Sequence, residues 1–241
     1  MKEIIFIPAR SGSVGIKNKN LKLINKKPLL YYTLQMCKKL KKNYKVFIST
    51  DSNKIANYCK GLGFNIKYRR PKKLSTSKSN IVDAVVHGVN WCNNYYKENF
   101  THVILLQPTS PIRKLSEIKR AISIARKKKL ESLASITKVR EHSLDHVKIS
   151  NKNSPSRWKY LRKRAKNINF RQQHDKNNFL LNGSIYIASI EFLKKNNKFV
   201  IENKTYLLNL SKIFSIDIDY WEDLFLADSI LRNNKIKKLL K

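Results

Sequence analysis

The chain has 241 residues, 41% of them hydrophobic, which allows one domain of ordinary size with a buried core. No run of about 18 apolar residues occurs, so we expect no membrane span, and we identify no secretory signal peptide in the first residues. The three cysteines form no CxxC pair, which indicates reduced core thiols in a cytoplasmic protein and excludes a disulfide framework or a structural zinc site.

The formal net charge is +35, from 51 basic and 16 acidic residues. Such an excess can indicate a polyanionic partner, either nucleic acid or an anionic membrane surface. The lysines are nevertheless spread along the whole chain and form no single stripe. We therefore do not expect a nucleic acid partner, and we expect the positive field to attract small anionic substrates.

The N-terminal part of the chain alternates short apolar runs with amphipathic stretches. The first run, residues 3–8 (EIIFIP), is β-branched and ends at a proline, which predicts a buried strand. The β-α-β-α-β order of the predicted elements is typical of a parallel sheet with helices on its faces. The remaining elements of this part are helix 27–40, strand 44–50, helix 54–63 and strand 64–68.

The same alternation continues along the chain, with one interruption. Residues 140–180 are polar and basic and lack long apolar runs, which indicates an arm inserted into the sheet-forming sequence. Apolar spacing predicts elements on both sides of this arm. They are helix 81–96, strand 101–108, helix 115–129, strand 133–139, strand 183–189, strand 213–219 and helix 221–234.

The segment IPARSGSVGIKNKN, residues 7–20, follows the first predicted strand and has the composition of an anion-binding loop. Backbone N–H groups of a glycine turn can point at an anion, and Arg10, Lys17 and Lys19 add positive charge. The segment matches neither the P-loop pattern nor GxGxxG. Ligands of open parallel sheets bind at the carboxyl ends of the strands, so we expect a phosphate site here; the alternative is a surface turn with solvated lysines.

Two further segments carry candidate site residues. In LLQPTSPIR, residues 105–113, prolines fix the backbone after a strand, and Gln107 offers both a donor and an acceptor. In SIDID, Asp217 and Asp219 would share one face of a strand, where paired carboxylates suit Mg²⁺ bound with phosphate oxygens. The alternative is a pair of solvent-facing acids. With the basic loop, these segments indicate transfer chemistry on a nucleoside triphosphate.

The chain resembles the acylneuraminate cytidylyltransferases, also called CMP-sialic acid synthetases. The resemblance extends over essentially the whole chain and rests on segments that occur in the family's order. These are IPARSGSVGIKNKN, STDS, RRPKKL, LLQPTSPIR, RQQ, NGSIYI and SIDID.

The resemblance implies a nucleotide-diphospho-sugar transferase-like fold. This is a single three-layer α/β domain over residues 1–241, with a parallel-rich mixed sheet and a small dimerisation arm at 140–180, so a homodimer is implied. The implied reaction joins a nonulosonic, sialic-acid-like sugar to CMP. It uses CTP and Mg²⁺ and releases pyrophosphate, as in the biosynthesis of cell-surface polysaccharides.

The resemblance also implies roles for particular residues. Asp217 and Asp219 match metal-binding aspartates, Gln107 matches a contact to the acceptor sugar, and Arg171 and Tyr186 fall on active-site positions. The implied catalytic residues are Arg10, Lys19, Arg171 and Asp219. With the loop, the substrate-binding residues are Arg10, Gly12, Ser13, Lys17, Lys19, Asn20, Arg70, Gln107, Arg171 and Tyr186.

The chain departs from the family pattern at two positions, and other functions stay open. Val14 stands where the family usually has a lysine, which removes a triphosphate contact, and Ser77 stands where it often has an aspartate. An inactive homologue is therefore one alternative. Another is a nucleotide-sugar glycosyltransferase, because Asp217-Ile218-Asp219 is also a DxD pattern. A third is a nucleic-acid-binding protein that uses the basic, aromatic segment 157–164.

Overall fold

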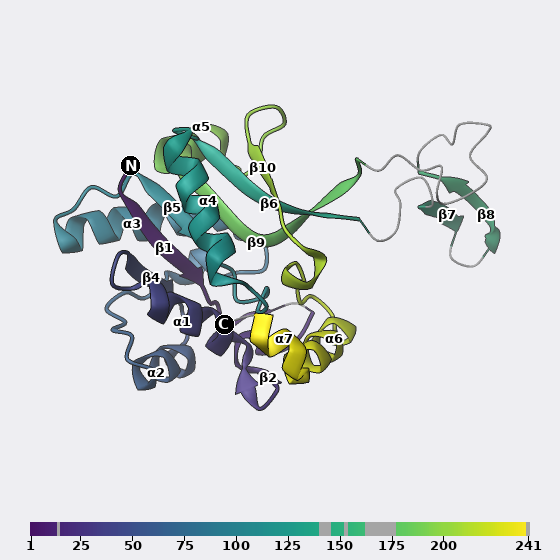
Figure 1. Cartoon of the computed structure of the whole chain (residues 1–241), viewed down its shortest axis with the longest axis horizontal. Coiled ribbons are helices and arrows are strands. Elements are labelled where there is room, and N and C mark those ends of the chain that lie inside the picture. Colours follow the sequence, from purple (N-terminus) through teal and green to yellow (C-terminus); the bar gives the residue numbers. More distant parts are fainter. Residues whose placement is uncertain (14, 140–145, 152–153, 162–176, 240–241) are drawn as a thin grey trace.

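The computed structural model describes residues 1–13, 15–139, 146–151, 154–161 and 177–239, and their arrangement confirms a three-layer α/β fold (Figure 1). The central sheet of the described residues has the strand order β10-β6-β9-β5-β1-β4. Its strands are β1 (Glu3–Pro8), β4 (Lys45–Ser49), β5 (His102–Leu105), β6 (Ser132–Lys138), β9 (Phe179–Ser189) and β10 (Tyr206–Asn209).

The sheet is mixed and mostly parallel. Strand β1 pairs in parallel with β4 and β5, and β10 pairs in parallel with β6. Strand β9 lies between β5 and β6 and runs antiparallel to both. The carboxyl ends of β1, β4 and β5 therefore meet at one edge of the sheet, next to the segment where β9 enters it.

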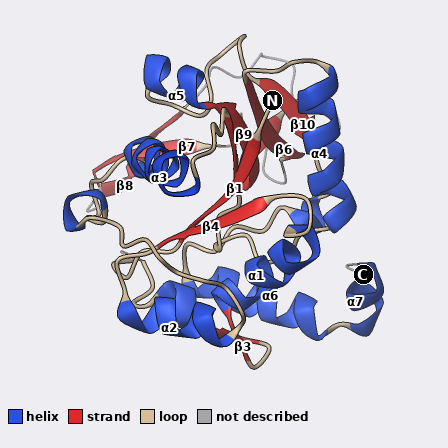
Figure 2. Cartoon of the chain, turned by 90° about the vertical axis from the view of Figure 1, so that its left-hand side faces the viewer, coloured by secondary structure: helices blue, strands red, loops and turns tan. Residues whose placement is uncertain are grey.

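Helices cover both faces of the sheet, because successive side chains of β1 pack against helices on opposite faces. Ile5 and Ile7 pack in one apolar cluster with α1, α2 and α4, whereas Ile4 and Phe6 pack in another with α3 and α5. Figure 2 shows α3 and α5 on one side of the sheet and α4 on the other. The helices are α1 (Leu29–Leu40), α2 (Asn53–Gly61), α3 (Ile81–Tyr96), α4 (Leu115–Lys127) and α5 (Ile190–Asn196).

A third apolar cluster brings residues of the N-terminal loop together with residues of the C-terminal part of the described chain. Helix α6 (Trp221–Arg232) packs there against the β2–β3 hairpin, and α7 (Asn234–Leu239) follows it. The hairpin strands are β2 (Leu23–Ile24) and β3 (Lys27–Pro28). Ile16 and Ile218 are fully buried in this cluster, so it joins the N-terminal loop to the segment that carries the aspartates.

Two predicted strands are wrong. Residues 64–68 form no strand, and residues 213–219 contain a short 3₁₀ turn, Lys212–Phe214, followed by irregular backbone. The apolar alternation at 213–219 arises because Ile218 is buried under α6; its N–H donates to the Thr109 carbonyl at 2.9 Å instead of joining a sheet ladder. The strand of this part of the chain is instead β10, which the sequence analysis missed.

The predicted arm contains a hairpin in its described part. Strands β7 (Val147–Asn151) and β8 (Ser154–Tyr160) pair antiparallel in a separate sheet, which Figure 1 shows beyond the ends of β6 and β9. Strand β9 begins at Phe179, so the last residues of the predicted 140–180 arm belong to the central sheet. No helix of the described residues is long and apolar enough to cross a membrane.

Candidate active site

A cavity of about 470 Å³ opens at the carboxyl ends of the parallel strands. Pro8 at the end of β1 and Gln107 beyond the end of β5 contribute to its wall, as predicted for ligand sites of such sheets. The N-terminus of α3, at Asn80 and Ile81, also lines the cavity. The predicted site residues that line this cavity are Arg10, Ser13, Lys19, Asn20, Arg70, Gln107 and Asp219.

The N-terminal loop is held at this cavity by hydrogen bonds to its neighbours. The backbone N–H and hydroxyl of Ser11 donate to the two carboxylate oxygens of Asp51, at 2.8 and 2.5 Å. The Asn20 amide donates to the Arg10 carbonyl at 2.9 Å, and the Arg10 guanidinium donates to the Thr76 carbonyl. Asp51, which follows β4, therefore fixes the backbone of the loop relative to the sheet.

Arg70 is a buried cation in the cavity wall. Its Nε and Nη2 donate to the hydroxyl and carbonyl oxygens of Ser49, both at 2.8 Å. Burial lowers the pKa of Arg70 from its usual value, and the nearby Asp51 carboxylate opposes this shift. Arg70 and Arg10 together place two positive charges against the cavity, which favours an anionic ligand.

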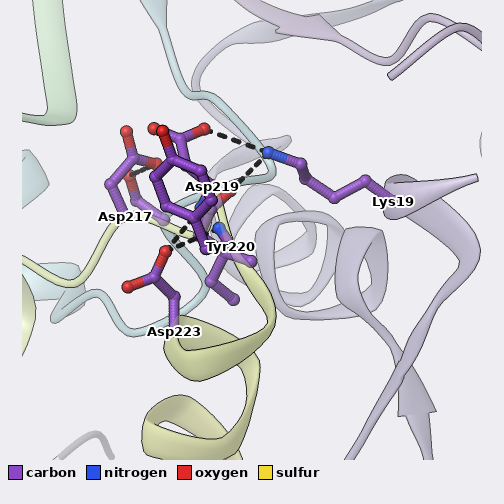
Figure 3. A network of polar contacts seen from close by, with 7 residues as sticks. Lys19, Asp217, Asp219, Tyr220 and Asp223 are labelled. Atoms are coloured by element: carbon purple, nitrogen blue, oxygen red, sulfur yellow. Dashed lines mark hydrogen bonds and ion pairs between the residues drawn. The ribbon is translucent and has the colours of Figure 1, made fainter. Parts of the chain in front are cut away.

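Lys19 joins the N-terminal loop to the C-terminal aspartate segment (Figure 3). Its Nζ donates to the Ile218 carbonyl at 2.6 Å and to Asp219 Oδ1 at 3.0 Å. The lysine side chain is 9% exposed and that of Asp219 is 66% exposed, so the ion pair presents its acidic member to the cavity. The Asp223 carboxylate accepts from the backbone N–H groups of Asp219 and Tyr220, at 2.9 and 2.8 Å, and fixes this segment.

Asp217 lies beside Asp219 and is half-buried (Figure 3). The Ser110 hydroxyl donates to Asp217 Oδ1 at 3.4 Å, and a Cβ added at Gly183 would lie 3.0 Å from Oδ2. Burial raises the pKa of Asp217, a hydrogen bond from Thr109 lowers it, and the neighbouring charge of Asp219 raises it. Two mutually repelling carboxylates of this kind are stabilised by a cation between them.

The donor set fits a magnesium ion. The side chains of Asp217 and Asp219 offer hard carboxylate oxygens, which Mg²⁺ prefers. A nucleotide bound in the adjacent cavity would add phosphate oxygens. No group of three or more His, Cys, Asp or Glu side chains in the described part of the chain could hold a metal. The pair at Asp217 and Asp219 would therefore complete its coordination shell with substrate and water.

A second cavity of about 490 Å³ adjoins the first. The two cavities share Asn80, Ile81 and Gln107, so the Gln107 side chain lies at their boundary. The second cavity has a mostly apolar wall with one cationic side chain. Its other lining residues are Val82, Leu105, Tyr186, Asn197, Lys198, Phe199 and Val200.

Five of the predicted site residues do not line the first cavity or cannot be placed. Tyr186 lines the second cavity, and Asp217 belongs to the lining of neither cavity. Gly12 and Lys17 are exposed and belong to neither lining. Arg171 lies outside the described residues, and so does Val14, where the family usually has a lysine.

Sequence reasoning missed two residues that organise the site. The sequence analysis gave Asp51 no role in the site, and its bonds to Ser11 depend on a contact between two loops. Arg113 ends the LLQPTSPIR segment and is almost completely buried, with 2% of its surface exposed. A charged residue inside an otherwise apolar and proline-rich segment was the available signal for Arg113.

Comparisons with known proteins agree with this fold. The chain is 28% identical over 227 residues to the N-acylneuraminate cytidylyltransferase of Streptococcus agalactiae serotype V, which covers 92% of this chain but 52% of that protein. The chain thus spans about half the length of this relative. It is 29% identical to the CMP-N,N'-diacetyllegionaminic acid synthase of Legionella pneumophila, with 98% of both chains covered.

The fold also matches a solved structure. A CMP:2-keto-3-deoxy-manno-octonic acid synthetase complexed with CTP superposes with a TM-score of 0.66 at 15% identity, covering 96% of this chain and 98% of that one. The family described as "Cytidylyltransferase" matches residues 4–237. The chain therefore belongs to the cytidylyltransferase family.

Proposed function

We propose that the chain transfers CMP from CTP to a nonulosonic, sialic-acid-like sugar and releases pyrophosphate. The observation that carries this proposal is the cavity at the strand ends, where Arg10, Lys19 and Arg70 lie close to a pair of carboxylates. The cations suit a triphosphate, and the carboxylates suit a divalent cation. Membership of the cytidylyltransferase family supports CTP as the nucleotide.

The proposed step is a displacement at the α-phosphorus of CTP. The anomeric hydroxyl of the sugar loses its proton to water, and its oxygen forms a bond to this phosphorus. The bond from the phosphorus to the bridging oxygen breaks, and pyrophosphate leaves. The protein would act mainly by positioning and by neutralising charge. Lys19 suits this role, because its ammonium group has three donors, and two of them bond to acceptors within the described residues.

We further propose that Asp217 and Asp219 hold Mg²⁺. The bound ion would neutralise charge on the phosphate oxygens during the displacement. Lys19 would keep Asp219 oriented toward the cavity through the 3.0 Å ion pair, and Gly183 would let the chain pass close to Asp217.

The second cavity is the proposed acceptor site. Gln107 lies at its boundary with the nucleotide cavity, which would bring an acceptor hydroxyl near the phosphates. Tyr186, Phe199 and Val200 offer apolar surface to methyl-bearing substituents of the sugar, and Lys198 offers a cation to its carboxylate. Relatives named for N-acylneuraminate and for diacetyllegionaminic acid support both sugars as candidates.

We also propose a cytoplasmic homodimer. The buried thiols of Cys37, Cys59 and Cys92 support a reducing compartment. Large exposed apolar side chains gather on the arm hairpin and on the strands next to it, which supports an interface with a second copy. These residues are Val147, Ile149, Tyr160, Leu161, Leu180, Leu181 and Leu207. Light scattering on the purified chain would give the mass of a dimer if this is correct.

Pyrophosphate release tests the proposed activity directly. The chain is incubated with CTP, Mg²⁺ and one acid from a panel that includes N-acetylneuraminate, legionaminate and pseudaminate derivatives. ATP, GTP and UTP replace CTP in control reactions, and a chelator replaces Mg²⁺. Release that requires CTP, Mg²⁺ and one particular acid would support the proposal and identify the sugar.

Two negative results would have different meanings. Tight CTP binding without pyrophosphate release would reject the tested acids as substrates. Failure to bind CTP would instead implicate the loop, where Val14 replaces the lysine of the family. A Val14→Lys variant should then gain CTP affinity, and if it also fails to bind, the proposed function is wrong.

A further inference from the structure

Arg113 is a charged side chain held in the interior, and it is hydrogen-bonded to Gln107, which lines both cavities. It lies between the LLQPTSP segment and α4, and 2% of its surface is exposed. None of the described carboxylates lies within ion-pair distance of it. Burying a cation without an ion pair is costly, so its hydrogen bonds must offset the lost solvation.

The Arg113 guanidinium uses its planar geometry to hold three separate elements. Nε donates to the Ser184 carbonyl of β9 at 2.8 Å, and Nη2 donates to the Gln107 carbonyl beyond β5 at 2.5 Å. Nη1 donates to the Thr33 hydroxyl of α1 at 3.0 Å. Burial lowers the pKa of Arg113 to about 10, so the group stays charged at neutral pH.

The position of these bonds relative to the sheet is informative. The antiparallel ladder of β5 and β9 ends at the pair Leu105 and Tyr186. Continuing this register by two residues on each strand places Gln107 opposite Ser184. Arg113 therefore bridges two carbonyls that lie two residues beyond the last pair of the ladder, at the point where β5 has ended and the chain leaves the sheet toward the site.

Both bridged residues adjoin groups that the proposed reaction uses. The Gln107 side chain lies at the boundary of the two cavities. Ser184 follows Gly183, whose backbone has a φ of 70° and packs against Asp217. A shift of either carbonyl would change the distance between the acceptor cavity and the carboxylates.

We propose that Arg113 is a positioning residue, which sets the acceptor sugar relative to the carboxylates by fixing Gln107 and the Gly183–Ser184 backbone. The identity of the acceptor rests on the proposed function above. The positioning itself rests on the three hydrogen bonds and on the register of β5 and β9.

An Arg113→Lys variant tests this inference, because lysine keeps the charge and loses the planar fork. We expect the KM for the acceptor sugar to rise about tenfold or more, with kcat also reduced. The Kd for CTP, measured by calorimetry without acceptor, should change by less than about twofold, because Arg10 and Arg70 have partners of their own.

Arg126→Lys is the matched control. Arg126 also makes a fork of hydrogen bonds, at 2.6 and 2.8 Å, to the buried carboxylate of Glu3. Glu3 begins β1, at the end of the sheet opposite the cavity. This variant should lower the unfolding temperature and leave the acceptor KM and the CTP Kd unchanged.

The results separate a positioning role from a purely structural one. If Arg113→Lys lowers the unfolding temperature but leaves the acceptor KM of the folded enzyme unchanged, the inference is wrong. If this variant does not fold, Thr33→Val removes only the Nη1 acceptor, and an unchanged acceptor KM in that variant would equally overturn the inference. Wild-type CTP binding and pyrophosphate release, measured first, test the proposed function independently.

Discussion

Gly15 marks the closest approach between the N-terminal loop and the aspartate segment. A Cβ at this position would lie 2.5 Å from the Asp219 carbonyl oxygen, a backbone atom that cannot rotate away. We predict that Gly15→Ala moves the loop and Lys19 away from Asp219. The expected result is a fall in kcat/KM for CTP of about a hundredfold, measured by steady-state pyrophosphate release.

Gly61 provides the control for this substitution. It lies in α2, and an added Cβ would meet nothing within 4 Å. Gly61→Ala should therefore raise the free energy of unfolding by about 0.5–1 kcal/mol and leave kcat/KM unchanged. Equal activity in Gly15→Ala and wild type would show that the loop tolerates the displacement.

The paired aspartates give a second prediction. Asp219→Asn and Asp217→Asn each remove one anionic oxygen from the proposed Mg²⁺ site, so Mg²⁺-dependent pyrophosphate release should fall at least about a hundredfold in both variants. Asp83→Asn, an exposed position in the first turn of α3, should keep wild-type activity. If either aspartate variant retained its dependence on Mg²⁺ with normal turnover, that residue would not be a ligand.

Sequence reasoning placed single residues at the cavity where these residues follow directly after a strand. Arg10 and Gln107 could be placed at the cavity because each follows an apolar strand of a parallel sheet. Arg113 could not be placed, because nothing in the local pattern shows that a cation turns inward to bridge two strands. Such a bridge depends on the register of β5 and β9, which pairing over a long sequence distance determines.

At the scale of elements, caps fix the helices that follow the site loops. The Ser52 hydroxyl accepts from the Ile55 N–H at 3.3 Å and caps α2. We predict that Ser52→Ala lowers the free energy of unfolding by about 1 kcal/mol in urea denaturation, because one helix donor loses its acceptor. Since α2 does not line either cavity, kcat/KM should be unchanged; a loss of activity would show that α2 supports the loop at Asp51.

Most helices and parallel strands could be predicted from their apolar periodicity. The segment at 213–219 could not, because a buried Ile218 produces the same alternation in irregular backbone as in a strand. Strand β10, Tyr206–Asn209, was missed since it is short and lies at the edge of the sheet, where few of its side chains are buried. The sequence analysis placed Asp217 and Asp219 on one face of a strand, and that part of the prediction is wrong. The metal site remains a proposal, which rests on the two carboxylates and their neighbours.

Over the whole molecule, the acidic residues are distributed unevenly. The chain has 16 acidic and 51 basic residues, and five of the acidic residues lie between residues 217 and 228. Asp217, Asp219, Glu222, Asp223 and Asp228 therefore form an acidic segment within a strongly positive chain. The general field attracts a nucleotide, whereas the local field at this segment attracts a divalent cation.

This distribution predicts a steep dependence on ionic strength. Between about 20 mM and about 500 mM NaCl, kcat/KM for CTP should fall about tenfold or more, because added salt screens the long-range attraction of the anionic nucleotide. The unfolding temperature should fall far less, or rise, as screening also reduces repulsion among the lysines. A kcat/KM that does not vary with salt would show that the charge has no part in substrate capture.

The strand order has a consequence for how the chain folds during synthesis. Strand β9 lies between β5 and β6, yet it is made only after both of them. Until residue 189 is available, the edge of β5 that faces away from β1 stays open, and β6 lacks the neighbour that joins it to the rest of the sheet. Nascent chains that stop earlier therefore expose unpaired strand edges, which are templates for aggregation, until β9 joins β6 to the rest of the sheet.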